Sequence, residues 1–171
     1  MMEPQKMPQD VGRVVLVDKY ATPLAIFLVL MGVTLSKPGG FVQNLSVSLL
    51  IFSIVFNMVM VRFITSGGAK PSLTLLRLLV NVTVNISLFY LLRTYWAPMW
   101  LLLVLTPVAT AIYGSFFRTV VTAVGISIVI LVIHVIQGPP GAVELGGEIT
   151  KAAFILSLSL MVNEFVRKRC H

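Results

Sequence analysis

The sequence predicts an all-α integral membrane protein, a bundle of six transmembrane helices with both the N- and C-termini in the cytoplasm. The first observation behind this prediction is composition, because 57% of the 171 residues are apolar and only 11% are charged. Soluble domains carry about 25% charged residues, so water is a poor solvent for most of this surface. The second observation is that the apolar residues form six runs separated by charged residues, glycine and proline.

Each apolar run was compared with the length of about 20 residues that a spanning helix needs. The expected spans, which form a single transmembrane domain over residues 1–171, are 16–36, 41–61, 73–92, 98–113, 119–136 and 149–166. The first span is the weakest, because its clearly apolar part begins only at Thr22 and stops before Lys37. In the fourth span Pro107 is expected to produce a kink, with neighbouring helices satisfying the freed carbonyl group.

The connections between the spans are expected to be short. Residues 65–72 and 137–147 are predicted to be loops, and 114–118 a tight turn. Aromatic residues at 95–100 suit a reversal at the membrane interface. Small residues favour close approach of helices in a membrane, and the candidate positions for such packing are Gly32, Gly114, Ala123 and Gly125.

Basic residues predict the orientation. With a cytoplasmic N-terminus, ten of the 13 Lys and Arg residues fall in cytoplasmic segments and three, Lys37, Arg93 and Lys151, in outer segments. This distribution follows the positive-inside rule. The net charge of +7 is therefore interpreted as a topology signal, and no nucleic-acid partner is expected. The lipid bilayer of the inner (plasma) membrane is the expected environment.

Polar residues inside the spans are candidate functional residues, because polar groups are costly in lipid. Asn81 and Asn85 are four residues apart and share one face of the third span, and Asn57 lies in the second. These amides could line a small polar cavity or bind a ligand. The simpler alternative is hydrogen bonding between helices, worth about 0.6 kcal/mol each. Asn44 is interpreted in the same way, with the structural role favoured.

Titratable residues near the ends of the spans provide further candidates. His134, near the outer end of the fifth span, could sense external pH, although a structural role is the simpler alternative. Arg167, Lys168 and Arg169 are expected to bind anionic lipid headgroups at about 1 kcal/mol each. Glu164 is expected to pair with Arg167 or Lys168.

Catalytic motifs are absent from the sequence, which contains no HExxH, GxSxG, P-loop or CxxC pattern. Cys170 is the only cysteine, so an intrachain disulfide and a thiolate metal site are both excluded. Neither of the two histidines has the companions expected at a metal site. No enzymatic activity, cofactor or metal is therefore expected.

One segment, residues 77–138, has a recognisable order of features. These are Arg77-Leu78, the polar Asn81 and Asn85, Ala97-Pro98, the mid-span Pro107 and the turn at 114–118. In this order the segment resembles the multi-pass N-terminal sensor region of bacterial membrane histidine kinases. Two features differ from that family: Tyr95-Trp96 stands where glycine is usual, and no ATP-binding domain follows in this sequence.

The resemblance covers about a third of the chain. It implies a sensory or signal-transduction module of a two-component system, without an attached catalytic domain. Such a module is expected to act as a homodimer or with a partner signalling protein. Two alternatives stay open: a substrate-binding membrane subunit of a small-molecule importer, and a structural accessory subunit of a membrane complex.

Overall fold

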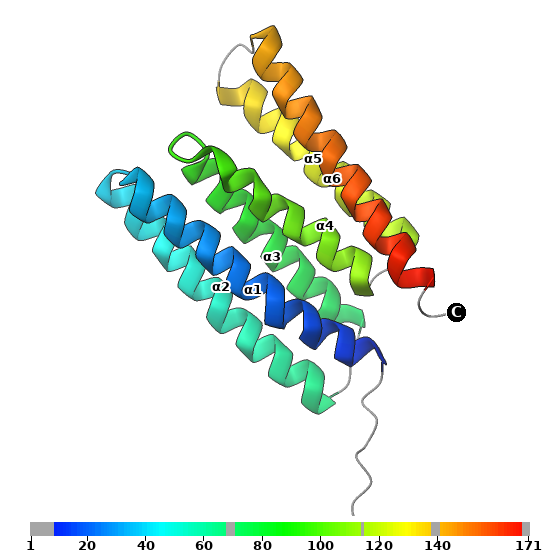
Figure 1. The fold of residues 1–171 in the computed structure, drawn as a ribbon. Helices are drawn as coiled ribbons and strands as arrows, with labels where there is room; N and C mark the ends of the chain where they lie inside the picture. Colours follow the sequence, from blue (N-terminus) through cyan, green and yellow to red (C-terminus); the bar gives the residue numbers. More distant parts are fainter. Residues whose placement is uncertain (1–8, 68–70, 114, 138–140, 169–171) are drawn as a thin grey trace, which may run out of the picture.

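The computed structural model describes residues 9–67, 71–113, 115–137 and 141–168. Within these ranges nearly every residue is helical and no strand occurs. The elements are α1 (Gln9–Ser36), α2 (Gly40–Gly67), α3 (Pro71–Leu92), the 3-10 helix η1 (Ala97–Trp100), α4 (Leu101–Tyr113), α5 (Phe116–Gln137) and α6 (Ala142–Lys168). The helices run up and down in one bundle, and α1 begins at the end where α6 finishes (Figure 1). We call this the terminal end, and the opposite end, which carries η1, the η1 end.

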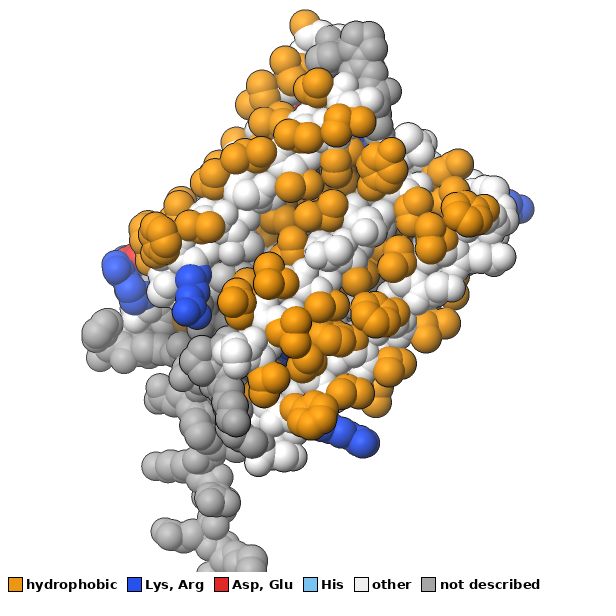
Figure 2. Space-filling model, turned by 180° about the vertical axis from the view of Figure 1, so that it is seen from behind, with side chains coloured by type: hydrophobic (Ala, Val, Ile, Leu, Met, Phe, Trp, Pro, Cys, Tyr) orange, Lys and Arg blue, Asp and Glu red, His pale blue; other side chains and the backbone are white. Residues whose placement is uncertain are grey.

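The surface of the bundle is that of a multi-pass membrane protein. Five helical segments are long and apolar enough to cross a membrane: Lys19–Ser36, Gly40–Ile64, Ser72–Leu92, Phe116–Ile136 and Ala142–Lys168. Large apolar side chains such as Phe63 and Phe117 are more than half exposed. In Figure 2 apolar side chains spread over the middle of the visible face, and the visible Lys, Arg and acidic side chains lie toward its margins. Such a surface suits lipid around the middle and water at the ends.

Helix α4 lies inside the bundle. It contacts α1 and α3 on one side and α5 and α6 on the other (Figure 1). Its buried side chains include Leu102, Leu103, Thr106, Pro107 and Thr110. Together with η1 it forms the shorter apolar segment Ala97–Ile112. Because other helices surround α4, lipid contacts little of its surface. The lipid therefore does not fix how long its apolar stretch must be.

Several helices are longer than the predicted spans, so the loops predicted at 65–72 and 137–147 are corrected to much shorter connections. Helix α2 continues past Arg62 to Gly67, and α6 begins at Ala142 instead of 149. An apolar run marks only the lipid-facing part of a helix. The backbone hydrogen bonds of the helix continue into the polar turns at either end of that run. In α6 these turns are supported by a bond from the Thr150 hydroxyl to the Gly146 carbonyl (2.8 Å).

The start of α5 has a capping residue that explains its position. The Ser115 carbonyl accepts from the Thr119 N–H at 3.0 Å, and its hydroxyl accepts from the Arg118 N–H at 3.4 Å. A serine that satisfies the first free N–H groups of a helix is a favoured N-cap. Helix α5 therefore begins at Phe116, three residues before the predicted span.

Two of the four predicted close-packing positions are confirmed. A Cβ atom at Gly32 would lie 3.1 Å from the Trp96 ring and 3.2 Å from the Met99 sulfur, and Ala123 is fully buried. The prediction for Gly125 is wrong, because a Cβ atom there meets nothing within 4 Å. It lies on the exposed side of α5, where small size brings no packing advantage. Gly114 lies outside the described residues.

Leucine substitution at these two glycines should have opposite effects. Gly32→Leu forces a large side chain against Trp96 and Met99, so we predict a loss of about 1–3 kcal/mol in unfolding free energy. Gly125→Leu adds an apolar, helix-favouring side chain on an open surface and should be neutral or stabilising, by up to about 1 kcal/mol. Thermal unfolding of the purified variants in the same detergent would compare them. Equal effects at the two positions would contradict the packing at Gly32.

Candidate functional site

The polar centre of the first four helices is a reciprocal pair of asparagines. Asn57 Nδ2 donates to Asn81 Oδ1 at 2.9 Å, and Asn81 Nδ2 donates to Asn57 Oδ1 at 3.0 Å. Arg77 Nε donates to the same Asn57 oxygen at 2.8 Å, and Asn57 Nδ2 also donates to the Ser53 carbonyl at 2.9 Å. Asn57 therefore uses both of its amide hydrogens and both lone pairs of its oxygen. The pair joins α2 to α3.

Asn85, one turn after Asn81, joins α3 to α4. Its Nδ2 donates to Thr106 Oγ1 at 3.2 Å and to the Leu102 carbonyl at 3.4 Å. Both bonds are long for N–H···O geometry, so this contact is weaker than the Asn57–Asn81 pair. The Asn85 Oδ1 accepts no hydrogen bond from any described residue.

A cavity of about 80 Å³ lies between α1, α2, α3 and α4. Asn57, Arg77, Asn81, Asn85 and Thr106 form most of its polar lining, and apolar side chains of the four helices form the remainder. For comparison, a protein cavity of about 150 Å³ can bind benzene, which has six non-hydrogen atoms. By the same measure this cavity has room for about three or four non-hydrogen atoms.

The polar lining is suited to recognition. The Asn85 oxygen can accept a hydrogen bond, the Thr106 hydroxyl can donate one, and Asn81 keeps one amide hydrogen and one lone pair beyond its bonds to Asn57. Among the described residues of the lining there is no carboxylate, histidine or cysteine. Arg77 is the one charged side chain among these described lining residues, and its Nε donates to Asn57. The other polar groups favour a small molecule that both donates and accepts hydrogen bonds.

A second polar cluster lies at the η1 end and contains His134. The ring nitrogen Nδ1 of this buried histidine lies 3.1 Å from Arg93 Nη2. Arginine can only donate, so Nδ1 is the acceptor and the neutral ring carries its hydrogen on Nε2. The guanidinium is also stacked over the Phe89 ring, at 5.4 Å from its centre. The first contact joins Arg93 to α5, and the second packs it on the last turn of α3.

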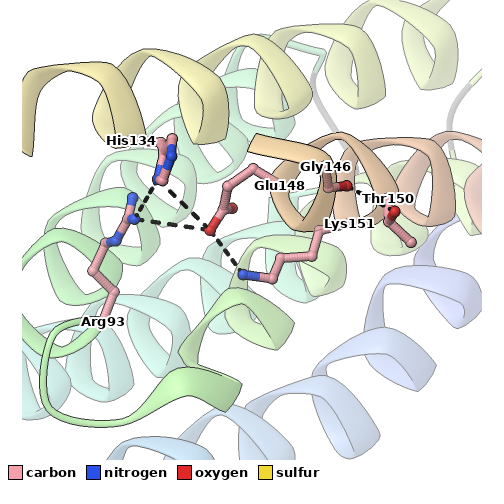
Figure 3. Close-up of polar contacts among 6 residues, drawn as sticks. All are labelled: Arg93, His134, Gly146, Glu148, Thr150 and Lys151. Atoms are coloured by element: carbon pink, nitrogen blue, oxygen red, sulfur yellow. Dashed lines mark hydrogen bonds and ion pairs between the residues drawn. The ribbon is translucent and has the colours of Figure 1, made fainter. Parts of the chain in front are cut away.

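The carboxylate of Glu148 lies at the centre of this second cluster. Its Oε1 is 2.8 Å from Lys151 Nζ, one turn further along α6. The same oxygen is 3.8 Å from Arg93 Nη2 and 4.0 Å from His134 Nδ1. Figure 3 shows three side chains pointing toward this oxygen: Arg93 from just after α3, His134 from α5 and Lys151 from α6. The cluster therefore holds one acid between two permanent cations and a histidine.

The predicted site residues thus separate into three places. Asn57, Asn81 and Asn85 come together, where they both hydrogen-bond between helices and line a cavity. His134 belongs to the cluster at the η1 end, and its pH sensing stays a prediction. Arg167 and Lys168 lie exposed at the terminal end, 2.8 and 3.8 Å from the carboxylate of Glu164. Their binding to lipid headgroups stays a prediction, and Arg169 lies outside the described residues.

Sequence reasoning missed several members of both sites. Arg77 is interpreted only as a topology signal and as part of the resemblance in residues 77–138, although its position four residues before Asn81 places both on one helix face. Thr106 gave no signal of its own. Glu148 falls between the predicted loop at 137–147 and the span at 149–166 and is given no role there, although its spacing of three from Lys151 indicates a helical ion pair.

Comparison with known proteins identifies no relative. No protein-family model matches the chain, and no curated protein or solved structure shows significant similarity to it. The resemblance of residues 77–138 to histidine-kinase sensor regions therefore stays a prediction. The function must be argued from the two polar sites.

Replacing Asn57 should destabilise the bundle far more than replacing another asparagine of α2. Asn57→Ala removes the buried oxygen that accepts from both Arg77 Nε and Asn81 Nδ2, so we predict a loss of about 1–3 kcal/mol in unfolding free energy. Asn44, which is exposed on the same helix, provides the matched control, and Asn44→Ala should change stability by less than about 0.5 kcal/mol. Thermal unfolding in detergent measures both variants. A similar loss at Asn44 would show that the buried network is not responsible.

Proposed function

We propose that the chain is a membrane-embedded sensory module that binds a small polar molecule in the α1–α4 cavity and transmits this binding to α6. The observation that carries the proposal is that α4 both lines the cavity and makes a buried hydrogen bond with α6. Thr106 lines the cavity and accepts a hydrogen bond from Asn85. Little more than one turn further along α4, the Ala111 carbonyl accepts from Asn163 Nδ2 of α6 at 3.1 Å. Asn163 is buried and also donates to Thr119 Oγ1 of α5, at 3.2 Å.

The sequence of α4 favours movement between these two contacts. Pro107 has no N–H group, so α4 lacks the backbone hydrogen bond that would normally end on the Leu103 carbonyl. Helices bend most easily where this ladder is interrupted. A ligand that draws Thr106 toward the cavity would therefore change the bend at Pro107 and so alter the angle of the segment that carries Ala111 and the α6 contact. Helix α6 ends five residues after Asn163, at Lys168, where an output partner would be engaged.

The proposal includes six membrane crossings with both termini in the cytoplasm of a bacterial cell. The η1 and α4 segments have 4 and 13 residues, which correspond to about 28 Å at the rises of 3-10 and α-helices. The hydrocarbon core of a bilayer is about 30 Å thick, so this shorter segment is long enough for a sixth crossing. The ten-to-three distribution of basic residues supports a cytoplasmic terminal end. Arg167 and Lys168 would then face anionic lipid.

The output of such a module requires a partner, either a second copy of the chain or a signalling protein of a two-component system. The order of features in residues 77–138 supports this version of the proposal. The same cavity would also serve a substrate-binding subunit of a small-molecule importer. The two functions differ in one respect: a sensor must move α6 when the cavity is filled.

Binding should depend on hydrogen-bond donation by the ligand. We predict that acetamide raises the melting temperature of the purified protein in lipid nanodiscs, because its size and its N–H and carbonyl groups complement the cavity. Acetone, which has the same shape but no N–H group, should raise it less. Asn85→Leu should remove the difference between the two compounds. Equal responses to acetamide and acetone in the natural chain would contradict a polar recognition site.

The response of α6 distinguishes a sensor from an importer subunit. In a Cys170→Ser background, spin labels at Phe63→Cys on α2 and Met161→Cys on α6 would report the distance between these exposed positions. We predict that acetamide changes this distance by about 1–2 Å, the usual size of a helix shift in signalling. Asn85→Leu should abolish the change. Binding without any change in distance would refute the sensory function and leave the importer subunit.

A further inference from the structure

The four side chains of the cluster at the η1 end carry a net charge of +1, and Glu144, the other described acid in the first turns of α6, makes no ion pair with them. Arg93 and Lys151 are cations, Glu148 is the single anion, and His134 is neutral in the tautomer that accepts from Arg93. The side chains of Arg93 and Glu148 are only 14% and 9% exposed, whereas that of Lys151 is 31% exposed. An unbalanced charge that is largely removed from water is costly unless an opposite charge approaches it.

The same cluster contains three buried polar atoms without a hydrogen-bond partner among the described residues. They are Arg93 Nη1, His134 Nε2 and Glu148 Oε2. In each side chain a single carbon joins the unpartnered atom to the atom that takes part in the contacts. Those contacting atoms are Arg93 Nη2, His134 Nδ1 and Glu148 Oε1. Those three network atoms lie within 4.0 Å of one another. The three unpartnered atoms therefore belong to the same three side chains that the network brings together.

The two observations define the chemistry of a ligand for this cluster. It must bring a negative charge, and it must accept hydrogen bonds from a guanidinium N–H and an imidazole N–H. It must also offer one donor to Glu148 Oε2, so an anion without a hydrogen, such as chloride, fits less well. A phosphate group that carries a hydroxyl, either on phosphorus or on an attached glycerol, meets all three requirements. Arginine recognises phosphate oxygens especially well because its N–H groups form a planar fork.

The geometry points to a phosphate-binding site at the η1 end, formed by Arg93, His134 and Lys151, with Glu148 receiving the ligand's hydroxyl. The site lies beside the aromatic residues of the η1 region, where Trp100 packs edge to face on Phe154 of α6 at 5.7 Å. Aromatic residues favour the depth of lipid headgroups. The phosphate can thus come from a phosphatidylglycerol headgroup or from dissolved inorganic phosphate. The site is separate from the α1–α4 cavity and does not depend on the function proposed for it.

Two ligand series separate the sources of phosphate. In the first, the melting temperature of the full chain in detergent is followed as inorganic phosphate replaces chloride at constant ionic strength. In the second, the chain is studied in phosphatidylcholine nanodiscs with and without phosphatidylglycerol. Stabilisation in the first series identifies a site for dissolved phosphate, and stabilisation in the second identifies a headgroup site. Absence of stabilisation in both series would overturn the proposal.

Three variants connect the response to the cluster. Arg93→Gln should weaken the apparent affinity at least tenfold, because one charge-assisted hydrogen bond is lost. Glu148→Gln should strengthen it, because the competing negative charge disappears while the cations stay and the amide oxygen still accepts from the ligand's hydroxyl. Lys37→Gln removes an exposed cation at the same end of the bundle and should leave the response unchanged.

The opposite signs keep the test decisive if one variant fails to fold. A weaker response of Glu148→Gln than of the natural chain would contradict the proposal, as would equal responses of Arg93→Gln and Lys37→Gln. Lys151→Gln, which changes the most exposed member of the cluster, replaces Arg93→Gln if that variant does not fold. It should also weaken the affinity, and an unchanged affinity would count against the site.

Discussion

The burial of α4 on opposite sides by α1 and α3 and by α5 and α6 is the constraint on which the bundle depends. In lipid, apolar side chains gain little by meeting one another, so helices associate through close packing and hydrogen bonds. Around α4 both are present: Met99 of the adjoining η1 fills the space beside Gly32, and the Asn85 and Asn163 amides reach α4 from opposite sides. A change in α4 therefore affects contacts on both sides of the bundle.

Lipid offers no hydrogen-bond partners, so polar groups inside the bundle must find their partners within the protein. Asn57 meets this requirement completely, since all four of its hydrogen-bonding positions are used. Asn85, which lines the cavity, meets it only in part, because its oxygen accepts from none of the described residues. The first amide therefore holds α2 and α3 together, and the second has capacity left for a ligand. Asn81, which bonds to Asn57, lies on the same face of α3 as Asn85, so the two roles are found side by side.

Much of the fold could be predicted from the sequence, since apolar runs of the right length and the charges between them are visible in it. The ends of the helices were less predictable. The first turns of α6 contain Glu144, Gly146 and Gly147, which an apolar scale assigns to a loop. The sequence could not predict which side chains of different helices contact one another. The common face of Asn81 and Asn85 follows from their spacing, but nothing in the chain shows that Asn57 lies opposite. Likewise, Gly32 and Gly125 look alike until the positions of Trp96 and Met99 are known.

Helix α3 connects the cavity to the cluster at the η1 end. Asn85 and Arg93 are eight residues apart, about 12 Å along a helix, and Arg93 is still bonded to the last turn through its N–H and the Phe89 carbonyl (2.9 Å). A helix of this length is rigid, so a displacement caused at one end reaches the other. If both sites bind their ligands, linkage requires each ligand to change the affinity for the other by the same factor. The sign of that factor follows from α3 itself. It is positive if both ligands draw α3 in the same direction, and negative if they draw it apart.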